Sequence, residues 1–149
     1  MNIKELKPSS KSRYEQGYVN PNTCKKLFES LRGEPIIFRS SLEKKFVTWC
    51  ETNPKVKAWG SECMQIPYWD PRDEKTHTYN PDFAIEMVDG KKIIIEIKPY
   101  SQSVKPKYPY RDDWNWNNYI KNTLKWQAAK DYLDARGIEF VVVTEKFFN

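Results

Sequence analysis

The chain has 149 residues, of which 39% are hydrophobic and 15% aromatic, a composition typical of one globular domain with a substantial core. This composition excludes a disordered chain, and no apolar run approaches the length of a membrane-spanning helix. The first residues form no apolar signal core, so we expect a protein that is not secreted. Three widely spaced cysteines match neither a zinc site nor a disulfide framework.

Positive charge is concentrated at the start of the chain. The formal net charge is +5, and residues 1–39 hold eight Lys or Arg against four Glu, which is +4 of that total. A basic arm of this kind suggests a polyanionic partner, although a solvated tail has the same composition. We therefore predict a basic N-terminal extension over residues 1–37, with a short helix, and a folded domain over residues 38–149.

The remaining elements are predicted from apolar periodicity and from Gly and Pro stops. In chain order we expect a short helix at 21–32, a longer helix at 40–52, extended segments within 56–66, a loop at 69–76, strands at 83–88 and 92–98, a loop at 99–113, a long helix at 116–136 capped by Gly137, and a buried strand at 138–144. From residue 40 onward the order is helix, three strands, helix, strand. This order predicts an α/β fold with a central mixed sheet flanked by helices.

The two strands at 83–88 and 92–98 each have a wholly apolar face, because side chains alternate between faces along a strand. These apolar sets are Phe83, Ile85 and Met87 on the first strand and Ile93, Ile95 and Ile97 on the second. Glu96 and Lys98 fall on the opposite face of the second strand, and Asp82 falls on the opposite face of the first.

The turn between these strands decides whether the acids meet. A two-residue turn at Asp89-Gly90 would send the two carboxylates to opposite faces. A three-residue bulged turn, Asp89-Gly90-Lys91 with Gly90 at positive φ, would pair Phe83 with Ile97 and Ala84 with Glu96. We predict the three-residue turn, because it places all the apolar faces together and brings Asp82, Glu96 and Lys98 to the other side.

Two carboxylates held together can bind a hard divalent cation through oxygen. The alternative is that Asp82 ends a loop and Glu96 faces solvent. However, Glu96 interrupts an isoleucine run in a strand expected to be central, where an isolated buried carboxylate would be costly. We therefore interpret Asp82 and Glu96 as ligands for Mg²⁺, with Mn²⁺ as a substitute.

Lys98 shares the face of Glu96 and can orient or help deprotonate an attacking water, or pair with a phosphate. Its alternative role is that of a solvated lysine at a strand end. Together with the two acids, Lys98 indicates metal-assisted hydrolysis of phosphodiesters.

Three segments in this order resemble the PD-(D/E)xK nuclease superfamily. They are Phe38-Arg39-Ser40-Ser41-Leu42-Glu43, His77-Thr78-Tyr79-Asn80-Pro81-Asp82-Phe83 and Glu96-Ile97-Lys98. Within the superfamily, residues 38–146 are similar to phage junction-resolving endonucleases and to the endonuclease subunit of heteromeric transposases. The whole chain is more similar to the small head-completion nucleases of contractile-tailed phages related to T4. The resemblance implies a restriction-endonuclease-like core over residues 38–149.

The resemblance also implies further site residues. Glu43 on the first helix would join the metal site, and the backbone carbonyl of Ile97 would add a ligand. Ser40-x-x-Glu43 is equally a capping box, so a purely structural role for Glu43 stays open. His77 and Gln127 are secondary candidates near the site, although a structural His and a polar helix face explain them as well.

Basic residues at the start of the chain and in the loop after the second motif strand are candidate DNA contacts. They are Lys4, Lys7, Lys11, Arg13, Lys105, Lys107 and Arg111. Aromatic residues are interleaved with the last three, an arrangement that can grip phosphates and stack on bases. An aromatic loop folded over the sheet, or a protein-docking surface, is the alternative.

These observations together predict a Mg²⁺-dependent DNA endonuclease. The resemblance implies that it acts on double-stranded DNA in phage head completion, processing or protecting packaged ends beside head or portal vertex proteins. Its expected location is the virion or the cytoplasm of the infected host, with no membrane partner, and double-strand cleavage would call for a homodimer. Two alternatives remain: an endonuclease specific for junctions or transposon ends, and a structural head-completion protein on a nuclease scaffold.

Overall fold

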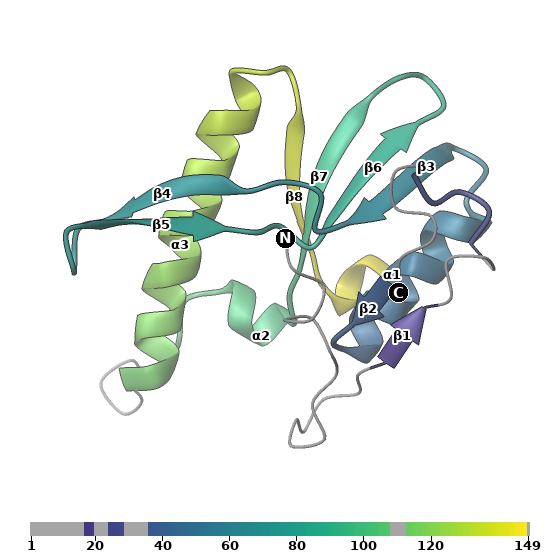
Figure 1. Cartoon of the computed structure of the whole chain (residues 1–149). Coiled ribbons are helices and arrows are strands. Elements are labelled where there is room, and N and C mark those ends of the chain that lie inside the picture. The colour runs from purple at the N-terminus through teal and green to yellow at the C-terminus, as the bar shows by residue number, and fades with distance from the viewer. Residues whose placement is uncertain (1–16, 20–23, 29–35, 108–112, 149) are drawn as a thin grey trace.

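The structure is a computed structural model that describes residues 17–19, 24–28, 36–107 and 113–148. A four-stranded sheet with the strand order β3-β6-β7-β8 lies at its centre (Figure 1). Its strands are β3 (Val56–Ser61), β6 (Phe83–Met87), β7 (Lys92–Ile97) and β8 (Glu139–Val143). The first three strands are antiparallel neighbours and β8 runs parallel to β7, so the predicted mixed sheet is confirmed.

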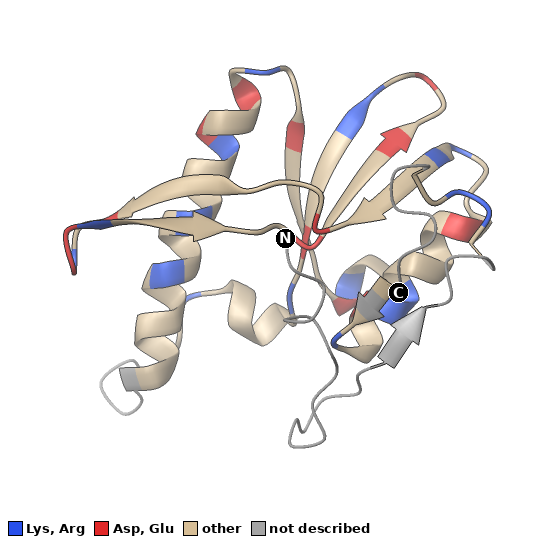
Figure 2. Ribbon diagram, in the orientation of Figure 1, with Lys and Arg blue, Asp and Glu red and all other residues tan. Residues whose placement is uncertain are grey.

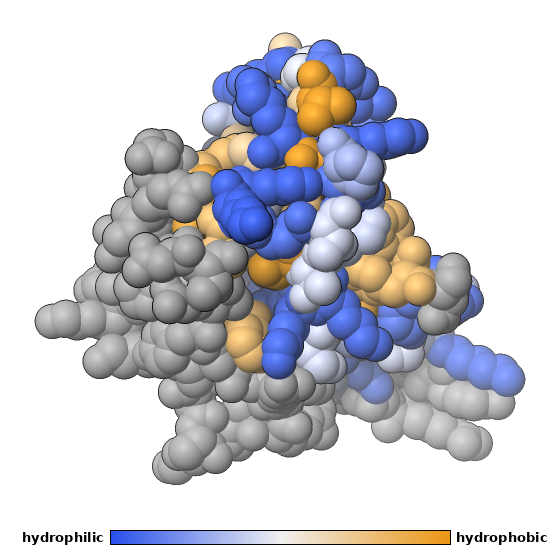
Figure 3. Space-filling model, turned by 90° about the vertical axis from the view of Figure 1, so that its right-hand side faces the viewer, coloured by the Kyte–Doolittle hydropathy of each residue, from blue (hydrophilic) through white to orange (hydrophobic). Residues whose placement is uncertain are grey.

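Two helices cover opposite faces of this sheet. α1 (Ser41–Thr52) packs Phe46 and Cys50 against one face, and its outer side belongs to the mostly hydrophilic surface in Figure 3. α3 (Asp113–Asp134) packs Ala129 and Leu133 against the other face. No helix in the described part of the chain is long and apolar enough to cross a bilayer. The restriction-endonuclease-like α/β core is therefore confirmed.

A second hairpin, β4 (Ile66–Asp70) and β5 (Lys75–Tyr79), lies along α3 as a separate two-stranded sheet (Figure 1). The loop predicted at 69–76 is therefore wrong, because only residues 71–74 form the turn. β4 alternates strictly between buried and exposed residues, so one side of this polar-looking segment faces the protein interior. β5 ends at Tyr79, just before Asp82, and so delivers the chain to the candidate site.

The sequence reading differs from the structure at the N-terminal part of the domain. Short strands β1 (Gly17–Val19) and β2 (Ile36–Phe38) pair with each other. Of the helix predicted at 21–32, the described residues 24–28 form a turn and a bridge from Leu27 to Trp59 instead. The carboxylate of Glu51 accepts the N–H groups of Lys25 and Lys26 at 2.6 and 3.0 Å, which holds this turn against α1.

The C-terminal elements follow the prediction with small changes. The loop predicted at 99–113 contains a single helical turn, α2 (Tyr100–Ser103), and α3 starts three residues earlier than expected. Gly137 has a φ of 70° and ends α3, as predicted. The strand at 138–144 exists as β8, but most of it is only half-buried because β8 lies at the edge of the sheet. A short 3-10 helix, η5 (Glu145–Phe148), follows.

The β6–β7 turn is a three-residue bulged turn with Gly90 at a φ of 90°, as predicted. It spans Val88-Asp89-Gly90, since the N–H of Met87 donates to Lys91 O at 2.8 Å and that of Gly90 to Met87 O at 2.9 Å. The turn thus begins one residue earlier than expected, and the predicted pairing of Phe83 with Ile97 is wrong: Phe83 pairs with Ile95. A shift of two residues keeps every side chain on its predicted face.

Candidate active site

Three of the predicted acids come together beyond the end of β6, beside β7 and at the start of α1. Burial raises the pKa of Asp82 well above its ordinary value, and the negative charges of Glu96 and Glu43 raise it further. Glu96 is only 7% exposed in the interior strand β7, and burial raises its pKa as well. Mutual repulsion of this kind arises only between carboxylates that lie close together.

Hydrogen bonds fix the two central carboxylates. Asp82 Oδ2 accepts the backbone N–H of Ile97 at 2.7 Å, which ties the loop before β6 to the end of β7. The hydroxyl of Tyr79, at the end of β5, donates to Glu96 Oε2 at 2.6 Å. The other oxygen of Glu96, Oε1, lies 3.7 Å from Nζ of Lys98. The predicted convergence of Asp82, Glu96 and Lys98 is therefore present in the structure.

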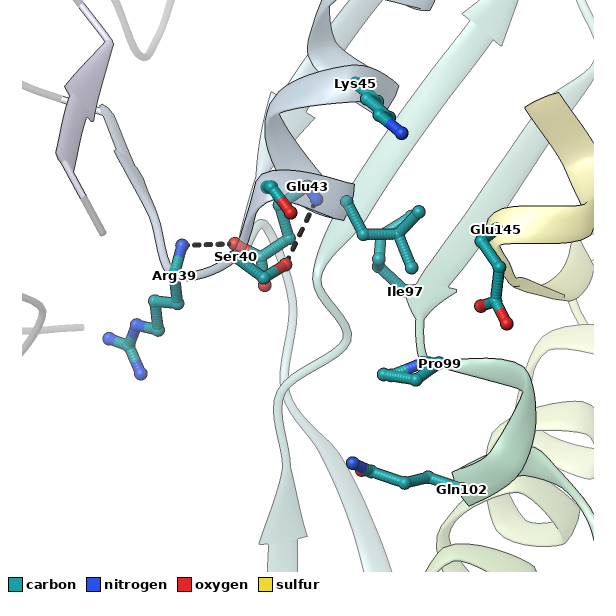
Figure 4. Close-up of a pocket in the computed structure, with 10 residues that line it drawn as sticks. Arg39, Ser40, Glu43, Lys45, Ile97, Pro99, Gln102 and Glu145 are labelled. Atoms are coloured by element: carbon teal, nitrogen blue, oxygen red, sulfur yellow. Dashed lines mark hydrogen bonds between the residues drawn. The ribbon is translucent and has the colours of Figure 1, made fainter. Parts of the chain in front are cut away.

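Glu43 combines the two roles that its sequence motif suggests. Its N–H donates to Ser40 Oγ at 3.1 Å, and its carboxylate accepts the N–H of Arg39 at 2.7 Å, one residue before the expected partner. It borders a pocket of about 410 Å³ that also contains Ile97 and Pro99 (Figure 4). Burial raises its pKa, and the charges of Glu62 and Glu96 raise it further. Glu43 thus caps α1 and belongs to the acid cluster.

Glu62 is a fourth acid of this cluster that sequence reasoning missed. It directly follows β3 with a left-handed φ of 50°, and its N–H donates to Asp82 O at 2.9 Å. Its Oε2 is buried with no hydrogen-bond partner among the described residues. A strained, non-glycine residue with an unsatisfied buried oxygen is typical of functional sites. The only signal in the sequence is an acid directly after a buried strand.

Lys125 on α3 is a second residue that the sequence did not single out. Its Nζ lies 5.4 Å from the centroid of the Tyr79 ring, and its charge lowers the pKa of Glu96. Burial and the charge of Lys121 lower the pKa of Lys125 itself. Lys121, Lys125 and the fully buried Ala129 recur at helical spacing, so this stripe of α3 faces the sheet.

The other predicted residues lie elsewhere. His77 on β5 bonds Asp73 at 2.7 Å, and Gln127 is exposed on α3, where it donates to Asp131. Lys105 lies over the ring of Trp116, with its Nζ 5.7 Å from the centroid. Lys107 is described and exposed, whereas Lys4, Lys7, Lys11, Arg13 and Arg111 lie outside the described residues.

Asp70, Asp73 and His77, at the tip of the β4–β5 hairpin, form a separate group with the geometry to hold a metal ion. Both oxygens of Asp70 already accept from Arg72, which lowers the pKa of Asp70 to about 2, and Asp73 is bonded to His77. The acids of this group are therefore compensated by neighbouring cationic or ring nitrogens. The cluster around Asp82 has no such full set of partners.

The Asp82 cluster fits a hard divalent cation. Four carboxylates influence one another there, namely Glu43, Glu62, Asp82 and Glu96, against the three cations Arg39, Lys98 and Lys125. Oxygen donors with excess negative charge are the ligands that Mg²⁺ and Mn²⁺ prefer. The unsatisfied Glu62 oxygen leaves a further donor without a protein partner in the described structure.

Comparison with known proteins assigns this fold and site to a class. The TnsA-like endonuclease N-terminal domain matches residues 53–145, well over half of the chain, so the chain belongs to that family. Nucleases of this PD-(D/E)xK type use divalent metals. The matched region contains Asp82, Glu96 and Lys98 and begins after Glu43.

A particular relative is similar over most of both chains. The head completion nuclease of Enterobacteria phage T4 is 35% identical over 127 residues, which cover 76% of this chain and 83% of that protein. The resemblance predicted from the three sequence motifs is thereby confirmed.

Removing the Tyr79 hydroxyl should shift the pH dependence of the site. In Tyr79→Phe, Glu96 loses a hydrogen bond to its charged form, so its pKa should rise further. The acid limb of the rate–pH profile for metal-dependent DNA cleavage should move up by about one pH unit. Tyr132→Phe, on the same face region of α3 but stacked on Arg136, is the control. An acid limb that coincides with that of the wild type would contradict this role of Tyr79.

Proposed function

We propose that this protein is a DNA endonuclease that depends on Mg²⁺, with Mn²⁺ as a substitute, and acts in phage head completion. The observation that carries this proposal is the contact of Asp82 with the Ile97 N–H, beside Glu96 and with Lys98 3.7 Å from it. Family membership supports the reaction, and the name of the T4 relative supports the biological process.

Each residue has a chemical role in this proposal. Asp82 and Glu96 would hold the cation, together with the Ile97 carbonyl and Glu43. When bound, the cation would supply charge neutralisation and polarisation of the scissile phosphodiester. Lys98 would orient the attacking water and pair with the phosphate, and its short distance to Glu96 holds its amine in place. Tyr79 positions Glu96 and does not touch the substrate.

The biological setting rests on similarity. We propose double-stranded DNA as substrate, with processing or protection of packaged ends beside head or portal vertex proteins. The location would then be the virion or the host cytoplasm, with a homodimer for double-strand cleavage. We also propose that the basic segment 1–37 is a separate DNA-contacting extension of the nuclease domain, 38–149. The family match also supports a transposon-end or junction-specific enzyme, which would share the same site.

Nicking of supercoiled plasmid tests the proposal directly. Wild-type protein with Mg²⁺ or Mn²⁺ should convert the plasmid to open circles, and Asp82→Ala should show no conversion above background. Asp134→Ala removes an exposed acid at the end of α3 and should cut like the wild type. Preference for a four-way junction over linear duplex would favour the junction-specific alternative. Absence of cutting by folded wild-type protein, in every metal, would overturn the enzymatic proposal in favour of a structural head protein.

A further inference from the structure

A polar pocket of about 380 Å³ lies between the β4–β5 hairpin and α3, outside the carboxylate cluster. Arg72 and His77 line it from the hairpin, and Lys121 and Lys125 line it from α3. Arg72 holds the two walls together, because it donates to Asp70 at 2.7 Å and to the backbone oxygen of Asn117 on α3 at 3.3 Å. The pocket is thus built by two elements that are cross-linked at its rim.

The charges of this pocket suit an anion. Its two acids are already engaged, Asp70 by Arg72 and Asp73 by His77. In the described structure, neither Lys121 nor Lys125 has a carboxylate within the 4.0 Å of an ion pair. The two amines repel each other, since Lys121 lowers the pKa of Lys125. An anion between them would relieve this repulsion.

The pocket is continuous with the candidate active site through Lys125. This side chain lies over the ring of Tyr79, whose hydroxyl donates to Glu96. Lys121 lies one helical turn further away, a rise of about 6 Å along α3. Basic residues mark the middle of α3 where β5 crosses it (Figure 2). The step of one turn is close to the spacing of neighbouring phosphates on a nucleic-acid strand.

We propose that Lys121 and Lys125 bind the backbone phosphates that neighbour the scissile phosphate, and that this pocket guides one DNA strand out of the active site between α3 and the β4–β5 hairpin. This inference rests on the proposed nuclease function. Arg72 acts as a positioning residue that fixes the hairpin on α3. The ligand is a phosphodiester, recognised by charge and not by base sequence.

The salt dependence of DNA binding tests this inference without any cleavage. The affinity for a short fluorescent duplex would be measured by anisotropy over a series of salt concentrations in EDTA. Each lost phosphate contact lowers the slope of log affinity against log salt by about one. We expect a slope lower by about one for Lys121→Ala, by about two for Lys121→Ala with Lys125→Ala, and an unchanged slope for Lys121→Arg.

Lys130→Ala is the matched control, because Lys130 is an exposed lysine on the same helix outside the pocket. It should leave the slope at the wild-type value. Equal slopes for Lys121→Ala and Lys130→Ala, or no measurable binding of the duplex by wild-type protein, would overturn the phosphate track. Plasmid nicking by the wild type reports separately on the nuclease function. A lower slope without nicking would keep the track and reject the enzyme, and nicking with equal slopes would do the reverse.

Discussion

Asp82→Asn should make the metal-free protein more stable and at the same time remove its metal-dependent cleavage. The wild-type carboxylate lies against Glu96 and Glu43, and its pKa is raised first by burial and then by those charges. Asn has nearly the same shape and can still accept the Ile97 N–H, but it carries no charge. Relief of such active-site repulsion is worth about 1–2 kcal/mol. This corresponds to a melting temperature higher by about 3–6 °C in a domain of this size.

The pH dependence of this gain has a definite sign. The folded-state pKa of Asp82 lies above its unfolded value, so the folded protein binds more protons and loses stability as pH rises between the two values. The difference between Asp82→Asn and the wild type should therefore be small near pH 3. It should grow through the raised pKa of the folded state and be constant above it.

Thermal unfolding with EDTA, and then with Mn²⁺, checks both parts of this prediction. Mn²⁺ should raise the melting temperature of the wild type and leave that of Asp82→Asn nearly unchanged. Asp89→Asn, in the exposed β6–β7 turn, is the control for a simple change of net charge. A variant that is less stable than the wild type in EDTA at neutral pH would show that Asp82 is not held at an electrostatic cost.

Lys98→Ala should slow plasmid nicking by about 10²–10³-fold, the range for losing a positioned proton-transfer or charge-stabilising group. Lys98 Nζ lies 3.7 Å from Glu96 Oε1, and its side chain is only 23% exposed. The effect should fall mainly on the rate at saturating DNA, because one lysine among many changes overall DNA affinity little. Single-turnover cleavage and anisotropy measurements separate the two quantities.

Lys57→Ala offers a close comparison for this variant. Lys57 on β3 pairs with Glu86 at 3.5 Å, a similar distance, but at an exposed position on the sheet. Its loss should leave the cleavage rate within about twofold of wild type, as for most surface ion pairs. Equal rates for Lys98→Ala and wild type would remove Lys98 from the reaction.

Local sequence signals were sufficient where they depend on alternation, caps and breakers. The faces of β6 and β7, the bulged turn with Gly90 and the Ser40 cap follow from the sequence and are present in the structure. The pairing itself was displaced by two residues, because the alternation of side chains fixes only whether the register is odd or even. The β4–β5 hairpin was missed because a polar strand that rests on one helix has few apolar residues to reveal it.

The sequence by itself determined the chemistry of the central site, since Asp82, Glu96 and Lys98 lie on two adjacent strands whose alternation brings them to one face. Only the tertiary structure added Glu62, Tyr79 and Lys125, because each comes from a different element whose position depends on how β3, β5 and α3 pack around the sheet. Such contacts are set by long-range packing, which leaves no periodic signal along the chain. The same packing places Lys121 beside the β4–β5 hairpin and so creates the pocket proposed for neighbouring phosphates.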